Sequence, residues 1–222
     1  MKDIYESKDE LYYKRVREDL INLLPKNNSQ KILEIGSGGG NTIIEIKSRG
    51  LASEVVGIDL FELEQSHQKN PLIDRFILCN LETDIIDLPF DHFDVIIAGD
   101  VLEHLVDPWM VIKKLTPFLK KGGKLIVSVP NIREISTMCK IFFKGDFDYN
   151  SQGGILDKTH LRFFCKKNVN QLFDLNEFRI DKVYSIIHIL PVKGLRYKLS
   201  NITFNLFDQF ITPQYVSVAS KK

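Results

Sequence analysis

The strongest constraint on the fold of this chain is a glycine-rich turn that follows an apolar strand near the N-terminus. Residues 32–41 read Ile-Leu-Glu-Ile-Gly-Ser-Gly-Gly-Gly-Asn, which places Gly36, Gly38 and Gly40 at alternate positions. Glycine there permits positive φ and lets backbone N–H groups approach a ligand with no Cβ in the way. The pattern predicts a nucleotide-binding turn.

An acidic residue narrows the ligand that this turn can hold. Glu34 lies two residues before Gly36, where its carboxylate would repel a pyrophosphate bound at a helix N-terminus. No Gly-Lys-Ser/Thr follows the turn, so a Walker phosphate loop is excluded. The acid instead suits a cationic ligand group. A second apolar run, 54–58, ends in Asp59, whose carboxylate can accept both hydroxyls of a ribose.

Composition excludes several other classes. The 222 residues are 44% hydrophobic, enough for one large core, and the formal net charge of +1 gives no overall field for nucleic acid or an anionic membrane. Cys79, Cys139 and Cys165 are widely spaced and odd in number, which fits neither a disulfide framework nor a zinc cluster. No apolar run approaches the roughly 20 residues of a membrane span. We expect a cytoplasmic protein that binds no nucleic acid.

Short β-type runs alternate with helix-type stretches, which is typical of parallel βαβ units. We expect strands near 31–35, 54–59, 74–79, 93–98, 123–129, 178–188 and 214–220. No clear crossover helix separates the last two strands, so the last one should pair antiparallel at the end of the sheet. The predicted class is α/β, with a seven-stranded, mostly parallel sheet, helices on both faces and one domain over 1–222.

Two helices have recognisable boundaries. Residues 11–24 form an amphipathic pattern stopped by Pro25, so 1–29 should form a helical cap ahead of the first strand. Asp107 followed by Pro108 predicts an N-cap with proline at the first helical position. We expect this second helix to run to about Leu119 and to end at Gly122-Gly123.

Four motifs together resemble those of class I S-adenosylmethionine-dependent methyltransferases. They are the glycine turn at 34–40, the strand end at 57–59, FDVIIAGDVLEHL at 93–105 and KGGKLIVSVP at 121–130. Each alone would be weak, but their order and spacing over about 100 residues make a specific signal. The resemblance covers about residues 30–190. It implies a Rossmann-like fold with S-adenosyl-L-methionine as cofactor.

The resemblance also implies which residues contact the cofactor. They are Glu34, Gly36, Ser37, Gly38, Gly40, Asp59, Leu60, Asn80, Leu81 and Asp100. The turn and Glu34 would hold the methionine portion, Asp59 the ribose, and Asp100 would lie below the methionine. The family usually places an acid on the adenine amino group. Here Asn80 takes that place through its amide oxygen, and its alternative role is to cap the next turn.

Two histidines lie where a general base is needed if the acceptor is a hydroxyl. His104 follows the fourth strand, and His160 lies in GGILDKTHLRFF at 153–164, a segment that resembles one in methyltransferases of bacterial cell-surface polysaccharide and sugar pathways. We predict both as catalytic, with Asp157 and Arg162 binding a hydroxylated or phosphorylated acceptor. In the alternative, Asp157 and Arg162 form an ion pair that fixes the loop, with His160 buried beneath it.

The fourth-strand motif also admits a metal. Asp100-x-x-Glu103-His104 resembles the Glu-x-x-Glu-His pattern of ubiquinone-pathway O-methyltransferases, some of which use a divalent cation. Two carboxylates and an imidazole could hold Mg²⁺ or a transition metal. Because Asp100 replaces the first glutamate and competes for a place beside the cofactor, we expect no metal.

Apolar residues outside the motifs favour a cover over the acceptor. Aromatic and aliphatic side chains recur in 131–165 and in 190–213, which we expect to be lid or insert segments on the acceptor side. Ordinary core packing or a homodimer interface is the alternative. Trp109 begins a helix that faces the cofactor cleft in the family, so we predict that it binds substrate, with simple helix packing as the alternative. His67, His92 and His188 lie in no comparable polar setting.

The first functional hypothesis is a methyltransferase that O-methylates a sugar, nucleotide-sugar or surface-glycan intermediate. Another small molecule, such as a quinone precursor or a nitrogen acceptor, is the first alternative. A domain that binds the cofactor without catalysis is the second. A nucleic-acid methyltransferase is disfavoured by the near-neutral charge and by the lack of an Asn/Asp-Pro-Pro-Tyr/Phe motif for flipped bases.

Overall fold

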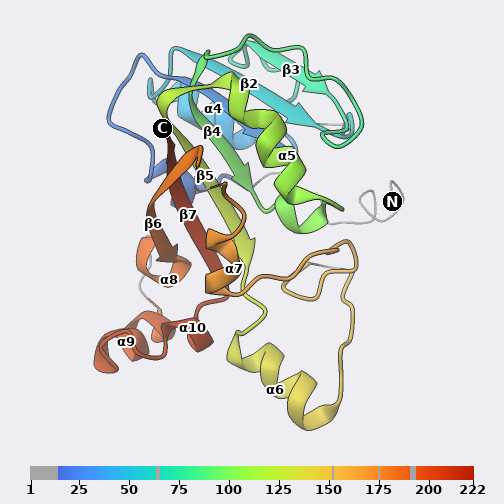
Figure 1. The fold of residues 1–222 in the computed structure, drawn as a ribbon, viewed down its shortest axis with the longest axis vertical. Coiled ribbons are helices and arrows are strands. Elements are labelled where there is room, and N and C mark those ends of the chain that lie inside the picture. Colours follow the sequence, from blue (N-terminus) through green and yellow to red (C-terminus); the bar gives the residue numbers. More distant parts are fainter. Residues whose placement is uncertain (1–14, 64–65, 152, 175, 191–193) are drawn as a thin grey trace.

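A computed structural model describes residues 15–222 except 64–65, 152, 175 and 191–193, and within these residues seven strands form one mixed sheet. The strands are β1 (Lys31–Ile35), β2 (Glu54–Asp59), β3 (Arg75–Leu78), β4 (Phe93–Gly99), β5 (Leu119–Pro130), β6 (Phe178–Ser185) and β7 (Gln214–Lys221). Their order is β3-β2-β1-β4-β5-β7-β6 (Figure 1). Strands β1 to β5 pair in parallel, and β7 is antiparallel to β5 and β6. The predicted sheet, including its antiparallel last strand, is confirmed.

Alternate residues of each central strand face opposite sides of the sheet, and each side has its own apolar layer. On one side Ile32 of β1 packs with Leu20 of α3 (Glu18–Ile21) and Ile43 of α4 (Asn41–Ser48). On the other side Leu33 packs in the layer that includes Leu115 of α5 (Pro108–Leu115) and residues of α7 (Lys166–Asn170). Because both faces are covered, the strands are apolar along their length, as parallel strands require.

The start of α5 is as predicted, but its end is not. The Asp107 side chain accepts a hydrogen bond from Met110 N at 2.9 Å, and Pro108 is the first helical residue. The helix stops at Leu115, a 3₁₀ turn η2 (Thr116–Phe118) follows, and β5 already begins at Leu119. The pair Gly122-Gly123 therefore lies inside β5, where the register with β4 shifts. The prediction was wrong because a glycine pair serves a bulged strand as well as a helix end.

The first predicted helix needs correction. Of the helix expected over 11–24, residues 11–14 lie outside the described part, and α3 covers only Glu18–Ile21. Between the last two strands, where no clear crossover helix was expected, lie the short helices α8 (Ile186–Ile189), α9 (Leu195–Ile202) and α10 (Asp208–Ile211). They do not form a parallel crossover, because β7 returns antiparallel to β6.

The two segments predicted to cover the acceptor lie at one end of the molecule. Helix α6 (Ile135–Lys144) follows the carboxyl end of β5, and α9 and α10 precede β7, so all three project beyond the sheet in Figure 1. An ion pair of 2.8 Å between Arg196 Nη2 and Glu134 Oε1 joins the segments. Among the described helices, none has both the length and the apolar character needed to cross a membrane.

Candidate active site

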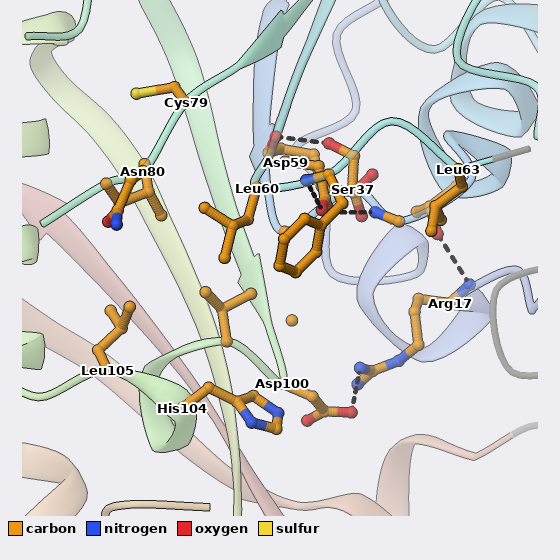
Figure 2. A pocket seen from close by; sticks show the side chains of 18 of the residues that line it. Arg17, Ser37, Asp59, Leu60, Leu63, Cys79, Asn80, Asp100, His104 and Leu105 are labelled. Atoms are coloured by element: carbon orange, nitrogen blue, oxygen red, sulfur yellow. Dashed lines mark hydrogen bonds and ion pairs between the residues drawn. The ribbon is translucent and has the colours of Figure 1, made fainter. Parts of the chain in front are cut away.

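A cavity of about 260 Å³ opens at the carboxyl ends of β1, β2, β3 and β4. The chain runs outward from β1 to β2 and β3 on one side and to β4 and β5 on the other, and α/β proteins bind ligands at such a switch point. The predicted site residues that line the cavity are Glu34, Gly36, Ser37, Gly38, Asp59, Leu60, Asn80, Leu81, Asp100 and His104. In Figure 2, Asn80 and Leu105 lie on one side of the cavity, Arg17 lies on the other, and His104 lies beside Asp100.

The glycine turn is shaped by contacts that only glycine permits. Gly36 has φ of 64°, and a Cβ there would lie 2.2 Å from Val101 Cγ2. Gly38 N donates a hydrogen bond of 2.7 Å to Asp59 Oδ2, so the turn is tied directly to the end of β2. Gly40 caps α4 with φ of 83° and is not among the residues that line the cavity, although we predicted a cofactor contact for it.

Two carboxylates, that of buried Glu34 and that of part-buried Asp59, line the cavity beside this turn. Glu34 Oε2 has no hydrogen-bond partner among the described residues. Burial raises the pKa of Glu34 to about 8, Arg17 opposes the shift, and the charge of Asp59 adds to it. Burial also raises the pKa of Asp59, against the hydrogen bonds from the backbone of Gly38 and Phe61. A buried carboxylate oxygen without a partner is costly, so this end of the cavity suits a ligand with an ammonium and hydroxyl groups.

The residues predicted to contact adenine line the cavity, but the Asn80 side chain already accepts a hydrogen bond within its own turn. Its Oδ1 accepts a hydrogen bond of 3.0 Å from Glu82 N, and its own N–H donates to Asp84 Oδ2 at 2.8 Å. The turn-capping alternative therefore describes this side chain. The same amide oxygen retains a second lone pair, and Asn80 lines the cavity together with Cys79 and Leu81.

Arg17 is a site residue that sequence reasoning missed. Its Nη1 lies 2.7 Å from Asp100 Oδ2, and Nη2 lies 2.7 Å from Asp19 Oδ2. Burial lowers the pKa of the Arg17 guanidinium, but the two carboxylates outweigh that effect and hold the pKa above its usual value. Asp100 itself has φ of 57°, unusual for a residue with a side chain. Arg17 thus brings a permanent positive charge to the cavity wall.

The acceptor end is assembled from two segments far apart in the sequence. The short helix η1 (Leu102–His104) receives the loop around His160, because Glu103 O accepts hydrogen bonds from Leu161 N (2.7 Å) and Arg162 N (3.0 Å). His104 Nδ1 lies 3.1 Å from Thr159 O, and His160 Nδ1 lies 2.9 Å from Ile155 O. A carbonyl oxygen only accepts, so each Nδ1 carries a proton. Each Nε2 is therefore the acceptor atom of its neutral ring.

A buried carboxylate completes this group. Glu103 is fully buried, and its Oε1 lies 4.0 Å from His160 Nε2. The His104 and His160 rings are 4.8 Å apart in an edge-to-face arrangement. One side-chain nitrogen or oxygen atom from each of these three residues lies within 4.8 Å of the other two. His104 lines the cavity directly, and His160 lies behind it. Glu103 had been named only as part of a metal motif, so its pairing with His160 is new information from the structure.

The three predicted substrate-binding residues do not line the cavity. Asp157 Oδ1 accepts hydrogen bonds from Thr159 N (2.8 Å) and Thr159 Oγ1 (2.6 Å), while Arg162 donates to Val106 O. The alternative Asp157–Arg162 ion pair is therefore wrong, although His160 is buried as that alternative expected. Trp109 Nε1 donates to Gln171 O at 3.0 Å.

Two of the histidines expected to lack a polar setting have acidic partners. His92 Nε2 lies 2.9 Å from Glu54 Oε2, and His188 Nε2 lies 2.6 Å from Asp208 Oδ2. That expectation was wrong because each partner belongs to another element of the chain.

Comparison with known proteins identifies the class. A family model described as a methyltransferase domain matches residues 7–183, so the chain belongs to this methyltransferase family. Solved structures share its fold, among them an S-adenosylmethionine-dependent methyltransferase from Archaeoglobus fulgidus. That structure has a TM-score of 0.62 and 16% identity over 96% of this chain and 97% of the other. The chain thus belongs to a methyltransferase-domain family and has the Rossmann-like fold of S-adenosylmethionine-dependent methyltransferases, as predicted.

Curated relatives carry more specific names. The human mitochondrial ubiquinone biosynthesis O-methyltransferase is 26% identical over 207 residues, which cover 86% of this chain and 54% of that protein. The mouse protein of the same name is 28% identical over 80% of this chain and 49% of its own length. The chain thus spans about half the length of these relatives. The predicted resemblance to sugar-pathway enzymes has no counterpart among these names and stays a prediction.

Fold alone does not define the reaction. The [4+2]-cyclase SpnF has a TM-score of 0.61 to this chain at 16% identity, covering 92% of this chain and 79% of its own. The acceptor and the catalytic groups must therefore be argued from the site itself.

Proposed function

We propose that this protein is an O-methyltransferase that uses His160 as general base on a phenolic hydroxyl of a quinone precursor or a related small molecule. The observation that carries the proposal is the convergence of Glu103, His104 and His160 at the acceptor end of the cavity. The names of the relatives, which cover 80% or more of this chain, favour the same chemistry. The sequence motifs alone favour a sugar hydroxyl instead.

Cofactor binding follows from the buried carboxylates. Glu34 is proposed to receive the ammonium of the methionine portion, which would neutralise a carboxylate oxygen that has no partner among the described residues. Asp59 is proposed to accept the ribose hydroxyls while Gly38 N keeps its carboxylate oriented. Arg17, held by Asp100 and Asp19, would face the carboxylate of the methionine.

When bound, S-adenosylmethionine supplies a methyl group on a positively charged sulfur, and the attack on it is an in-line displacement. The protein must hold the acceptor oxygen in line and remove its proton. His160 lies behind His104 and does not line the cavity, so the proposal requires the acceptor hydroxyl to pass beside the His104 ring and reach His160 Nε2. Nε2 is the atom that takes the proton, because Nδ1 already donates to Ile155 O. The Glu103 carboxylate, 4.0 Å away, then stabilises the imidazolium that forms. His104, on the cavity wall, orients the acceptor.

A phenol suits this base better than an alcohol does. The pKa of a phenol is about 10, closer to that of imidazole than an aliphatic hydroxyl is, so proton transfer to histidine is easier. Aromatic side chains also extend from the base, since the His160 and Phe163 rings are 6.5 Å apart and Phe163 and Phe147 are 5.7 Å apart. Such rings favour a planar acceptor.

A sugar hydroxyl is the second candidate, favoured by the resemblance of 153–164 to a segment of sugar-pathway enzymes. In either case Asp157 would act by positioning, because its carboxylate holds Thr159 and thereby the loop that carries His160. Binding of a phosphorylated acceptor by Arg162, and contact of an acceptor with Trp109, remain predictions.

A divalent cation would compete with this proton-transfer role. The carboxylate and two imidazoles are a donor set that suits a transition metal better than Mg²⁺. Asp100, the first residue of the metal motif, is instead ion-paired with Arg17. We therefore keep metal-free catalysis as the prediction.

The test is turnover of purified protein with phenols and nucleotide sugars, read by mass spectrometry for one added methyl. His160→Gln should lower kcat about 100-fold or more, because general bases contribute that order of rate, while cofactor affinity changes little. His92→Gln, at the opposite end of the sheet, is the matched control. Unchanged kcat in His160→Gln, or a loss on exhaustive chelation that an added cation restores, would overturn the base assignment.

A further inference from the structure

A buried glutamine behind the cavity wall joins two segments that form the wall. Gln68 is 5% exposed and is not among the residues that line the cavity. Its Nε2 lies 2.9 Å from Gly38 O and 3.0 Å from Phe61 O. Its Oε1 lies 3.1 Å from Leu63 N. Because Gly38, Phe61 and Leu63 all line the cavity, Gln68 fastens the glycine turn to the loop that follows β2.

The orientation of the Gln68 amide follows from these contacts. Carbonyl oxygens only accept hydrogen bonds, so the atom that faces Gly38 O and Phe61 O must be the nitrogen, with one hydrogen for each. The amide oxygen accepts from Leu63 N. Both donors of a buried amide are therefore in use. Leucine fills a similar space and glutamate has the same shape, but neither offers two N–H donors.

The two residues whose carbonyl groups bind Gln68 also bind Asp59 through their amide groups. Gly38 N donates to Asp59 Oδ2 at 2.7 Å, and Phe61 N donates to Asp59 Oδ1 at 3.3 Å. Each carboxylate oxygen thus has a backbone donor from a residue that Gln68 holds. Asp59 and Leu63 both lie on the cavity wall (Figure 2). Loss of the Gln68 amide would release both donor residues together.

The glycine turn needs such a restraint. Gly38 has φ of 53°, which glycine adopts readily but does not hold, because no side chain restricts its rotation. The hydrogen bonds at Gly38 N and Gly38 O restrain the residue from both sides. At the next residue, Gly39 O accepts from His67 N at 3.0 Å. The segment that carries Gln68 is therefore itself bonded to the turn.

We propose that Gln68 is a positioning residue that directs the Asp59 carboxylate toward the ribose hydroxyls of the cofactor. It acts through the backbone of Gly38 and Phe61, because its own side chain does not line the cavity. A carboxylate that turns away loses the geometry for accepting two neighbouring hydroxyls at once. The inference rests on the proposed role of Asp59 and adds what keeps that carboxylate in place.

The experiment is a double-mutant cycle on cofactor binding, measured by isothermal titration calorimetry with S-adenosylmethionine up to millimolar concentration. Gln68→Leu should weaken binding about tenfold, because two carbonyl groups lose their donor. Gln68→Glu should weaken binding at least as much, since its carboxylate would face two carbonyl oxygens. In the Asp59→Ala background, Gln68→Leu should change affinity less than about twofold, because the carboxylate that Gln68 positions is gone.

The matched control is Gln30→Leu. Gln30 is also buried, and its Nε2 donates to Leu51 O at 2.8 Å and to Pro25 O at 3.3 Å. It precedes β1, at the opposite end of that strand from the cavity. Gln30→Leu therefore removes a buried amide that joins two loops, and it should leave cofactor affinity unchanged.

Three results would overturn the proposal. They are unchanged affinity in both Gln68 variants, an equal loss from Gln68→Leu in the wild-type and Asp59→Ala backgrounds, and an equal loss in Gln30→Leu. If Gln68→Leu does not fold, Gln68→Glu, which keeps the shape of the side chain, replaces it in the cycle. Wild-type affinity in Asp59→Ala would overturn the ribose assignment itself. A loss there without a loss in the Gln68 variants would overturn this proposal alone.

Discussion

The cofactor side and the acceptor side of the cavity are built in different ways. On the cofactor side, the glycine turn follows β1 and Asp59 ends the neighbouring parallel strand β2, and Gly38 N donates a hydrogen bond of 2.7 Å to the Asp59 carboxylate. On the acceptor side, His104 and Thr159 are 55 residues apart and meet only through packing of the loop on η1. The cofactor side is therefore encoded in local sequence, and the acceptor side depends on tertiary contacts.

The largest expected effect tests the cofactor side. Asp59→Ala removes the part-buried carboxylate proposed to accept two ribose hydroxyls, so cofactor affinity should fall about 1,000-fold, or roughly 4 kcal/mol for two hydrogen bonds to a charged group. Isothermal titration calorimetry with S-adenosylmethionine measures it. Asp74→Ala, which removes a carboxylate bonded to Val55 N at the other end of β2, should leave affinity unchanged. Equal losses in both variants would mean that general destabilisation explains the effect.

The contrast explains what the sequence could predict. The strand bounds at β1, β2 and β4 follow from periodicity. Nine of the ten cofactor residues implied by the family resemblance line the cavity, in agreement with the rule that parallel strands end at one edge. Gly40 is the exception, since it turns the chain into α4 instead.

The features that were not predicted depend on contacts between residues far apart in the sequence, which no local pattern shows. Arg17 meets Asp100, which is 83 residues away, and Glu103 meets His160 only after 155–164 docks on η1. Gly122-Gly123 was assigned to a helix end because both a helix end and a bulge favour glycine. These failures share one cause, because each outcome is decided by an element distant in sequence.

A second prediction concerns Arg17, which joins the two sides. Arg17→Met leaves Asp19, which is buried, and part-buried Asp100 without their shared cation, so we expect a loss of about 3 kcal/mol in the free energy of unfolding. Urea denaturation measures this loss. Arg49→Met breaks exposed ion pairs with Glu18 and Glu45 and should cost much less. A loss in Arg17→Met no larger than that of the control would show that water replaces the guanidinium.

A third prediction concerns pH and cofactor binding. Burial raises the pKa of Glu34 from 4.5 to about 8, so the free protein holds this carboxyl protonated at neutral pH. An ammonium bound there would favour the ionised form. Cofactor affinity should therefore increase with pH, by up to about tenfold per unit, and level off above pH 8. Glu34→Gln should remove the part of this pH dependence that comes from Glu34, while the part that comes from ionisation of the cofactor persists. Identical plots of cofactor affinity against pH for wild type and Glu34→Gln would contradict the assignment of Glu34 to the cofactor ammonium.

The smallest expected effect lies on the acceptor side, at the start of β7. Tyr215 is fully buried, its hydroxyl has no hydrogen-bond partner among the described residues, and burial raises its pKa to about 12. Tyr215→Phe removes a desolvated hydroxyl without loss of ring packing, so unfolding free energy should rise by about 1 kcal/mol, a few degrees in Tm. Thermal unfolding of Tyr215→Phe against Tyr184→Phe, a less buried tyrosine of β6, measures it. A decrease in stability would mean that the Tyr215 hydroxyl donates to a group outside the described residues. The acceptor side would then be stabilised by buried hydrogen bonds, as the cofactor side is.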